Sequence, residues 1–181
     1  MKIFKWIIAG IGTVLVGFLL YYFFSVSGQV LEVTWNKVRV EKMEKIGGMN
    51  EYELKRIGLS TDQVQDILAH PEKYRYVLYS MTLTNGSNMT AVANLEVKVQ
   101  MPVDLQRRLV WIDDEFKMLP YLGPAEKRPD GLYGIFTLEE SDTEQTLQDM
   151  AKKTRFTITG QKIGRLFNHG TFSITVTYSG N

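Results

Sequence analysis

The sequence contains no cysteine, which excludes disulfide bonds, thiolate metal ligands, a cysteine nucleophile and a lipid-modified cysteine anchor. It also has little net charge, because 21 Lys and Arg against 20 Asp and Glu leave +1. A chain without a basic excess offers no surface that would attract nucleic acid. We therefore expect no nucleic-acid partner, no disulfide-linked partner and no cofactor. The length of 181 residues suits one compact domain plus a short extra segment.

One long hydrophobic run lies near the N-terminus. The stretch from Ile7 to Phe24 has no charged side chain, and it begins at Ile3 if Lys5 extends towards the membrane surface. At about 1.5 Å per helical residue, roughly 18 to 22 residues cover about 27 to 33 Å, the thickness of the hydrocarbon core of a bilayer. The sequence therefore predicts a single transmembrane helix within an N-terminal anchor of residues 1–28.

The alternative to an anchor is a cleaved signal peptide, with Ser25-Val26-Ser27 as its cleavage site. The apolar run is longer than the roughly 7 to 15 residues of a signal-peptide core, so we expect an uncleaved signal-anchor. Lys2 and Lys5 precede the run, whereas residues 25–36 contain no Lys or Arg. This charge bias predicts a single-pass protein of the cell membrane, with a cytoplasmic N-terminus and an extracytoplasmic domain over residues 29–181.

Small residues recur at a spacing of four within the apolar run. Ala9, Thr13 and Gly17 would share one face of a helix and would let another helix approach closely. These three residues are our helix-packing candidates. The alternative is a lone anchor that faces only lipid.

Beyond Gln29 the hydrophobic pattern has mostly a period of two, which is typical of half-buried strands. The clearest case runs from Thr171 to Tyr178, where apolar and hydroxyl-bearing residues alternate. Further strands are predicted near residues 31–40, 77–83, 95–101, 109–112, 132–138 and 156–159. Residues 109–112 and 132–138 are apolar on both faces, so we expect both of these strands to be central in a sheet. The inward-facing parity switches near Asn36, which predicts a bulge.

Turns and helices are predicted between these strands. Turn residues at 85–88 and 168–170 separate neighbouring strands, and the second set predicts a hairpin. Two capping boxes, Ser60–Gln63 and Ser141–Glu144, each predict the start of a short helix. The first helix would bury Val64, Ile67 and Leu68, and the second would bury Leu147, Met150 and Ala151.

Together these patterns predict a mainly β protein. We expect one N-terminal transmembrane helix followed by an immunoglobulin-like antiparallel β-sandwich of seven to eight strands, with two short helices in the connections. In general organisation the chain resembles bacterial surface proteins that carry an immunoglobulin-like sandwich outside a single N-terminal membrane helix. The resemblance covers the whole chain but rests on architecture, because the Cys-Trp-Cys core of true immunoglobulin domains is absent. It therefore assigns no functional residue.

The residues that catalyse reactions are scarce in this sequence. Neither of the two histidines has a patterned partner, and no nucleophile elbow, paired-histidine metal motif or phosphate-binding loop occurs. Two acidic clusters, Asp113–Glu115 and Glu139–Asp142, would form an acid–base pair only if the fold brought them together. We expect no catalytic residue and no metal site, with a carboxylate-dependent envelope hydrolase as a lesser alternative.

The stretch from Phe116 to Pro129 is a candidate recognition loop. It contains three of the five prolines and fits neither a strand nor a helix period. Rigid prolines reduce the entropy lost on binding, and aromatic and Met side chains anchor interfaces. Our partner-binding candidates are Phe116, Met118, Leu119, Tyr121 and Leu122. The alternative is that these residues fold back and close one end of the sandwich.

The leading functional hypothesis is a non-catalytic module that binds another membrane or envelope protein, or an envelope polymer. Confinement to a membrane raises the effective concentration of the domain, so weak contacts through the candidate loop or a free strand edge would suffice. The alternative is an accessory subunit that docks into a larger membrane complex through its transmembrane helix.

Overall fold

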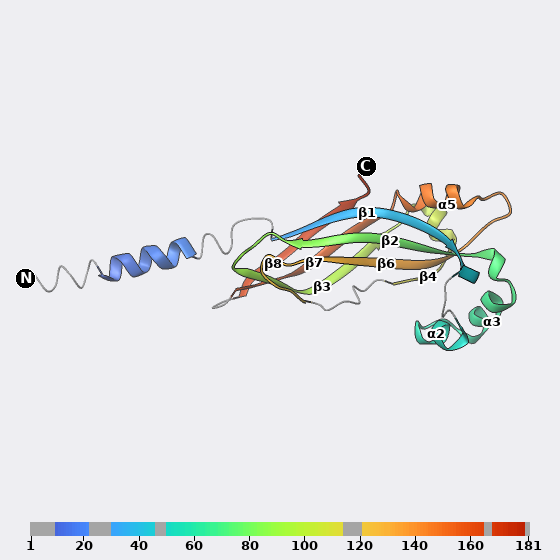
Figure 1. Ribbon diagram of the computed structural model, residues 1–181, viewed down its shortest axis with the longest axis horizontal. Coiled ribbons are helices and arrows are strands. Elements are labelled where there is room, and N and C mark those ends of the chain that lie inside the picture. Colours follow the sequence, from blue (N-terminus) through green and yellow to red (C-terminus); the bar gives the residue numbers. More distant parts are fainter. Residues whose placement is uncertain (1–9, 22–29, 46–49, 114–120, 165–167, 180–181) are drawn as a thin grey trace, which may run out of the picture.

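The computed structural model describes residues 10–21, 30–45, 50–113, 121–164 and 168–179. The described residues form a mainly β fold with two antiparallel sheets of four strands each (Figure 1). The strands are β1 (Leu31–Lys42), β2 (Tyr74–Asn85), β3 (Thr90–Gln100), β4 (Leu109–Ile112), β5 (Tyr121–Leu122), β6 (Lys127–Thr137), β7 (Arg155–Gly164) and β8 (Asn168–Thr177). The first sheet has the order β1-β2-β6-β4 and the second has the order β5-β3-β7-β8. The predicted β class and strand number are confirmed.

The main hydrophobic core lies between the two sheets. Trp35 on β1 and Tyr79 on β2 both approach Phe156 on β7, with ring centroids 5.1 Å apart in each case. Tyr79 and Phe156 are fully buried. Alternate residues of the long strands point into this core, which is the arrangement that the period of two predicts.

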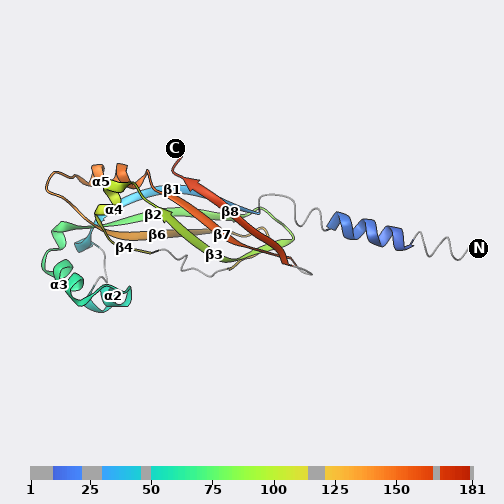
Figure 2. The same cartoon turned by 180° about the vertical axis from the view of Figure 1, so that it is seen from behind.

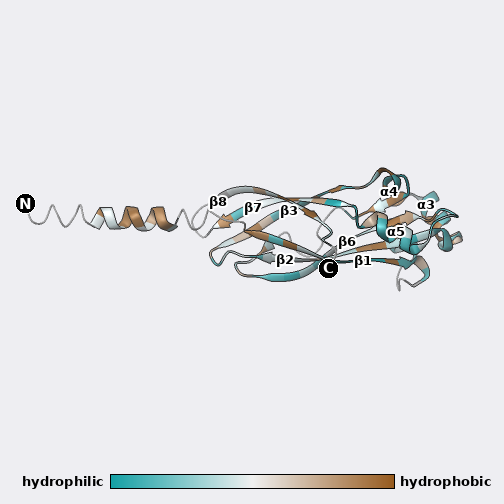
Figure 3. Cartoon of the chain, turned by 90° about the horizontal axis from the view of Figure 1, so that it is seen from above, coloured by the Kyte–Doolittle hydropathy of each residue, from teal (hydrophilic) through white to brown (hydrophobic). Residues whose placement is uncertain are grey.

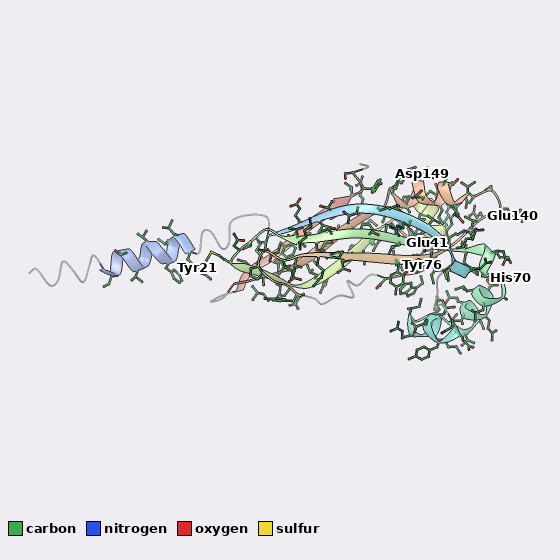
Figure 4. The ribbon with its side chains drawn as sticks, viewed as in Figure 1. Tyr21, Glu41, His70, Tyr76, Glu140 and Asp149 are labelled. Atoms are coloured by element: carbon green, nitrogen blue, oxygen red, sulfur yellow. The ribbon has the colours of Figure 1, made fainter. Side chains whose placement is uncertain are left out.

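A smaller second core covers the outer face of the first sheet. Helices α2 (Glu51–Arg56) and α3 (Thr61–Ala69) bury Leu54, Val64 and Ile67 against Tyr74 and Ile135. Figure 4 shows Tyr76 on this same side of the sheet and His70 at the end of α3. The sheet is therefore apolar on both faces at this end, because one face packs on the main core and the other packs on the helices.

Of the two strands predicted to be central, one is central and the other lies at an edge. β6 is central in its sheet, as predicted, but β4 pairs with β6 alone and lies at the edge of the described sheet. Val110 and Trp111 of β4 pack against the second core. The apolar character of β4 on both faces therefore reflects cover by helices and not a central position.

The strand β1 contains the predicted bulge, because its register with β2 shifts between Trp35 and Lys37. Helix α5 (Glu144–Ala151) lies beside this strand, and the side-chain amide of Gln148 donates a hydrogen bond to the carbonyl oxygen of Val38 at 2.7 Å. The outer edge of β1 is therefore partly covered by a helix.

The predicted helices are present, with local differences. Ser60 caps α3 through the predicted capping box, and Val64 and Ile67 are buried, but Leu68 is 47% exposed. The predicted capping box Ser141–Glu144 is wrong, because the N-cap of α5 is Thr143, whose hydroxyl accepts from the amide of Thr146, and Glu144 pairs with Arg75 instead. Leu147 and Ala151 are buried as predicted. Two further short helices, α2 and α4 (Val103–Arg107), were not predicted.

The two turn signals have different outcomes. β7 and β8 form the predicted hairpin, but residues 168–170 already belong to β8, because Asn168 pairs with Ile163. Residues 85–88 separate β2 from β3, and these strands belong to different sheets. Asn85 is buried at this crossing and donates hydrogen bonds to the carbonyl oxygens of Thr90 and Gly123 at 2.8 and 2.9 Å.

Residues 10–21 form a helix on the N-terminal side of the sheets, and this helix is largely apolar (Figure 3). Its large side chains are exposed, with Val14 at 72% and Leu19 at 62%. Within the part of the chain that the structure describes, no helix combines the length and the apolar character that crossing a membrane requires. The predicted segment from Ile7 to Phe24 extends past this helix at both ends, into residues outside the described ranges.

Candidate functional site

Four of the described strands lie at sheet edges, and three of these edges are protected against further pairing. β4 has four residues and β5 has two, so both are too short to offer a long pairing surface, and the stretches of β6 and β3 that extend past them carry charged residues. β1 carries the charged residues Lys37, Arg39 and Glu41 and has α5 beside it. Short strands, charges and covering helices are the usual protection of sheet edges.

Within the described ranges, the fourth edge, β8, has none of these protections. It is ten residues long, and residues 168–179 contain no Asp, Glu, Lys, Arg or Pro. Figure 2 shows β8 beside β7 as the outermost strand of its sheet. A long, uncharged edge exposes a row of backbone N–H and C=O groups that can pair with another strand. We therefore take β8 as the candidate functional site.

The two faces of β8 differ in chemistry. Thr171, Ser173, Thr175 and Thr177 are exposed on the outer face, whereas Phe172, Ile174 and Val176 point to the core side. The hydroxyl-bearing residues continue onto the neighbouring strand, because Thr175 pairs with Thr157 and Ser173 pairs with Thr159. A strand that joined this edge would therefore extend a hydroxyl-rich face on one side and an apolar face on the other.

Two hollows lie along the flank where β8 faces β1. One has a volume of about 330 Å³ and lies between residues 32–35 of β1 and residues 174–177 of β8. The other, of about 430 Å³, is lined by Val30, Leu31, Lys162 and residues 172–175. Both hollows are shallow depressions beside the edge. Grooves of this kind receive alternate side chains of an added strand, while the edge itself supplies the backbone hydrogen bonds.

The predicted recognition loop is only partly described, and its described part begins with β5, at the opposite edge of the sheet from β8. Phe116, Met118 and Leu119 lie outside the described residues. Tyr121 is 49% exposed, whereas Leu122 is fully buried in the main core. Leu122 therefore fits the alternative in which this segment closes the core.

The C-terminal part of this stretch is a strand and not a loop. Residues 127–129 belong to β6, where Pro129 pairs with Thr82. Proline is tolerated at positions where the strand needs no hydrogen bond on its other side. The guanidinium of Arg128 donates a hydrogen bond to the carbonyl oxygen of Tyr121 at 3.1 Å and thereby ties β6 to β5.

The acidic cluster Glu139–Asp142 forms an ion-pair network. Arg108 contacts Asp142 at 2.8 Å (Nε to Oδ2) and Glu139 at 2.9 Å (Nη2 to Oε2). The hydrogen bond to Asp142 raises the pKa of Arg108 above its ordinary value. Only 6% of the Asp142 side chain is exposed, so this carboxylate is held inside the network and not in solvent. The network links α4 to the segment that precedes α5.

The two acidic clusters do not meet at Asp113. The amide of Asp113 donates to the carbonyl oxygen of Tyr133, whereas the second cluster follows the end of β6 at Thr137. Thr137 follows Tyr133 by four residues along β6, which at about 3.4 Å per residue is a distance of about 14 Å. A carboxylate pair of a glycosidase spans at most about 9.5 Å. Asp114 and Glu115 lie outside the described residues.

Metal ligands are also not gathered in the described part of the chain, where no group of three His, Asp or Glu side chains could hold an ion.

Of the helix-packing candidates, Thr13 and Gly17 lie on the helix of residues 10–21, and Ala9 lies outside the described residues. Apart from the neighbouring residues and the backbone of the helix itself, no described atom lies within 4 Å of the position that a Cβ on Gly17 would occupy.

The second core contains a phenol with an altered pKa. Burial, together with the hydrogen bond that its hydroxyl donates to Asp66 of α3, raises the pKa of Tyr74 to about 12. An unfolded tyrosine ionises near pH 10. The unfolded chain therefore loses this proton first as the pH rises, and the contribution of Tyr74 to stability is complete below pH 10 and lost between pH 10 and pH 12.

We accordingly expect the free energy of unfolding to fall between pH 10 and pH 12, and Tyr74→Phe to make this fall less steep. Denaturant titrations followed by circular dichroism at half-unit pH steps measure both slopes. Tyr52→Phe is the matched control, because Tyr52 is 71% exposed on α2. Equal slopes for Tyr74→Phe and the unaltered protein would contradict the assignment.

Sequence reasoning foresaw a free strand edge as a means of binding but did not single out β8. The signal was present, because no charged residue follows Arg165. Only the sheet order shows that this uncharged strand is an edge and that β1 faces it across a groove.

Comparison with known proteins adds no assignment: no protein-family model matches the chain, and no curated protein is significantly similar to it.

Proposed function

We propose that this protein is a non-catalytic binding module, anchored in the cell membrane by its N-terminal segment, that captures an extended segment of another membrane or envelope protein along β8. The observation that carries the proposal is the long, uncharged edge of β8, beside which no further strand lies in the described sheet, together with the two hollows. Addition of a strand to such an edge uses main-chain hydrogen bonds for affinity and side-chain hollows for selectivity.

The strand order supports an immunoglobulin-like β-sandwich as the scaffold. Constant-type immunoglobulin domains have one sheet of strands A-B-E-D and another of strands C-F-G. The order β1-β2-β6-β4 corresponds to A-B-E-D, and β3-β7-β8 corresponds to C-F-G, with the two-residue β5 as an addition. In this scheme β8 is strand G. Helices α2 and α3 occupy the connection between the first two strands.

The anchor is supported by the apolar character of the N-terminal segment. The helix of residues 10–21 exposes large apolar side chains, among them Val14, Phe18 and Leu19. A helix that is apolar on all sides is typical of a membrane span or of a deeply buried helix. The uncharged run from Ile7 to Phe24 and the lysines that precede it favour the same membrane topology, with the β domain outside the cytoplasm.

Photo-crosslinking in intact cells tests this function. We expect a full-length chain with a photoreactive residue at Thr175 on β8 to appear in the membrane fraction and to form a discrete protein adduct. The matched control is the same group at Lys98, which is exposed on β3, two strands away from β8 in the same sheet. Equal labelling from both positions, or recovery of the full-length chain in the buffer-soluble fraction, would contradict the proposal.

A further inference from the structure

We infer that the segment captured by β8 is β8 of a second copy of this chain, which pairs antiparallel across a two-fold axis at Ile174. This inference rests on the proposed function, because it names the partner of the same edge. Homodimers with two-fold symmetry are the commonest soluble oligomers, and their interface requires a surface that is complementary to itself.

The sequence of β8 is complementary to itself in this register. The rotation places Ile174 opposite its own copy, Ser173 opposite Thr175, Phe172 opposite Val176, and Thr171 opposite Thr177. Each hydroxyl-bearing residue on the exposed face thus meets another hydroxyl-bearing residue, and each apolar residue on the core side meets another apolar residue. Such cross-strand pairs stabilise antiparallel sheets.

Electrostatic repulsion does not oppose this pairing, because residues 168–179 contain no Asp, Glu, Lys or Arg. The strand β1 is different. Pairing of β1 with its own copy would bring together like charges from Lys37 and Arg39, and α5 already lies against the same strand. Like charges placed directly opposite each other destabilise a sheet. Of the two long edges, β8 is the one suited to self-association.

The charged residues that line the two hollows also fit the two-fold rotation at Ile174. The half of the groove near Phe172 carries Lys162, and the half near Val176 carries Glu32. A two-fold axis at Ile174 exchanges the two halves between copies. The half that carries a positive charge in one copy therefore lies against the half that carries a negative charge in the other, so the arrangement adds attraction across the groove.

The same arrangement keeps both N-terminal segments close together. Val30, where the described domain begins, lines the hollow next to Phe172. Phe172 of the second copy lies opposite Val176, four residues or about 14 Å along the strand from Phe172 of the first. Residues 22–29 separate Val30 from the helix of residues 10–21 in the sequence, and eight residues can span at most about 28 Å. Because the rotation reverses the second domain, both segments can enter one membrane only if it lies parallel to β8, and linkers of this length permit that.

Disulfide crosslinking of the full chain in cell membranes tests the dimer, and the absence of native cysteine makes it specific. Chains with Ser173→Cys are co-expressed with chains with Thr175→Cys and then oxidised. Both positions are exposed, so the fold should tolerate the changes. We expect a reducible band at twice the mass of the single chain. Either variant alone should give no such band, because its two cysteines lie diagonally, at about 7 to 8 Å.

Two further variants control this experiment. Thr157→Cys with Thr159→Cys has the same spacing on β7, which pairs with β3 on one side and with β8 on the other, and should remain monomeric. Thr171→Lys with Thr177→Lys, added to both cysteine chains, places facing lysines on exposed positions and should abolish the band. An unchanged melting temperature shows that these lysine substitutions leave the domain folded.

The outcomes separate this inference from the proposed function. A strong dimer band from Ser173→Cys alone or Thr175→Cys alone would overturn the register at Ile174. No disulfide dimer, together with a photo-adduct at Thr175 that contains a different protein, would overturn the second copy as partner and retain the binding function. No disulfide dimer and no adduct at Thr175 would overturn both.

Discussion

Replacing Phe156 by alanine is expected to lower the free energy of unfolding by about 3 to 5 kcal/mol. The ring of Phe156 is fully buried on β7 and contacts Trp35 and Tyr79 of the opposite sheet, with ring centroids 5.1 Å apart in both cases. Its removal leaves a cavity between the two sheets, and the edge-on aromatic contacts are lost as well. For a domain of this size the melting temperature should fall by roughly 10 °C.

Denaturant and thermal unfolding followed by circular dichroism measure this loss. The matched control is Tyr52→Ala, which removes an aromatic ring that is 71% exposed and should change stability by no more than about 0.5 kcal/mol. A loss below about 1.5 kcal/mol for Phe156→Ala would mean that Phe156 does not join the two sheets.

Replacing Asn85 by alanine is expected to lower stability by about 3 kcal/mol. This amide is 1% exposed and lies where the chain crosses from one sheet to the other. Its Nδ2 donates to the carbonyl oxygens of Thr90, Leu122 and Gly123 at 2.8, 3.3 and 2.9 Å, and its Oδ1 accepts from the amide of Ser87 at 2.9 Å. The substitution leaves these buried groups without their partner, which is more destabilising than the loss of an exposed hydrogen bond.

Two variants sharpen the test of Asn85. Asn85→Asp keeps the acceptor for Ser87 but turns an oxygen towards three carbonyl oxygens, so we expect it to be at least as destabilising as alanine. Asn36→Ala removes an exposed amide with a single hydrogen bond to Thr82 and should reduce stability by less than about 1 kcal/mol. Similar losses for Asn36→Ala and Asn85→Ala, measured by urea unfolding, would argue against the bridging role of Asn85.

The strands β4 and β8 show that an apolar pattern predicts which faces are buried but not what covers them. Alternation along β8 predicted a strand with one buried face, and the exposures agree. The same reasoning placed β4 in the centre of a sheet, because a double-sided apolar pattern does not say whether a strand or a helix provides the cover. In this protein α2 and α3 provide it. Periodicity reports burial and does not identify the covering element.

The candidate site illustrates the same division. The uncharged character of β8 is a property of consecutive residues, and it can be read from the chain alone. Its position at a sheet edge depends on pairing with β7 and on the absence of a further strand beside it in the described sheet. Such pairings join residues far apart in the chain. The fate of Asp142 is similar, because its partner Arg108 lies 34 positions earlier.

What the sequence determined by itself is therefore local. The alternation of polar and apolar residues specifies the strands, the capping box at Ser60 starts α3, and the parity switch produces the bulge after Trp35. Only the tertiary structure decided which strands share a sheet, which edges stay open and which acids are paired. The physical reason is that local conformation follows from interactions between near neighbours, whereas sheet order follows from burying all the apolar faces at once in one core.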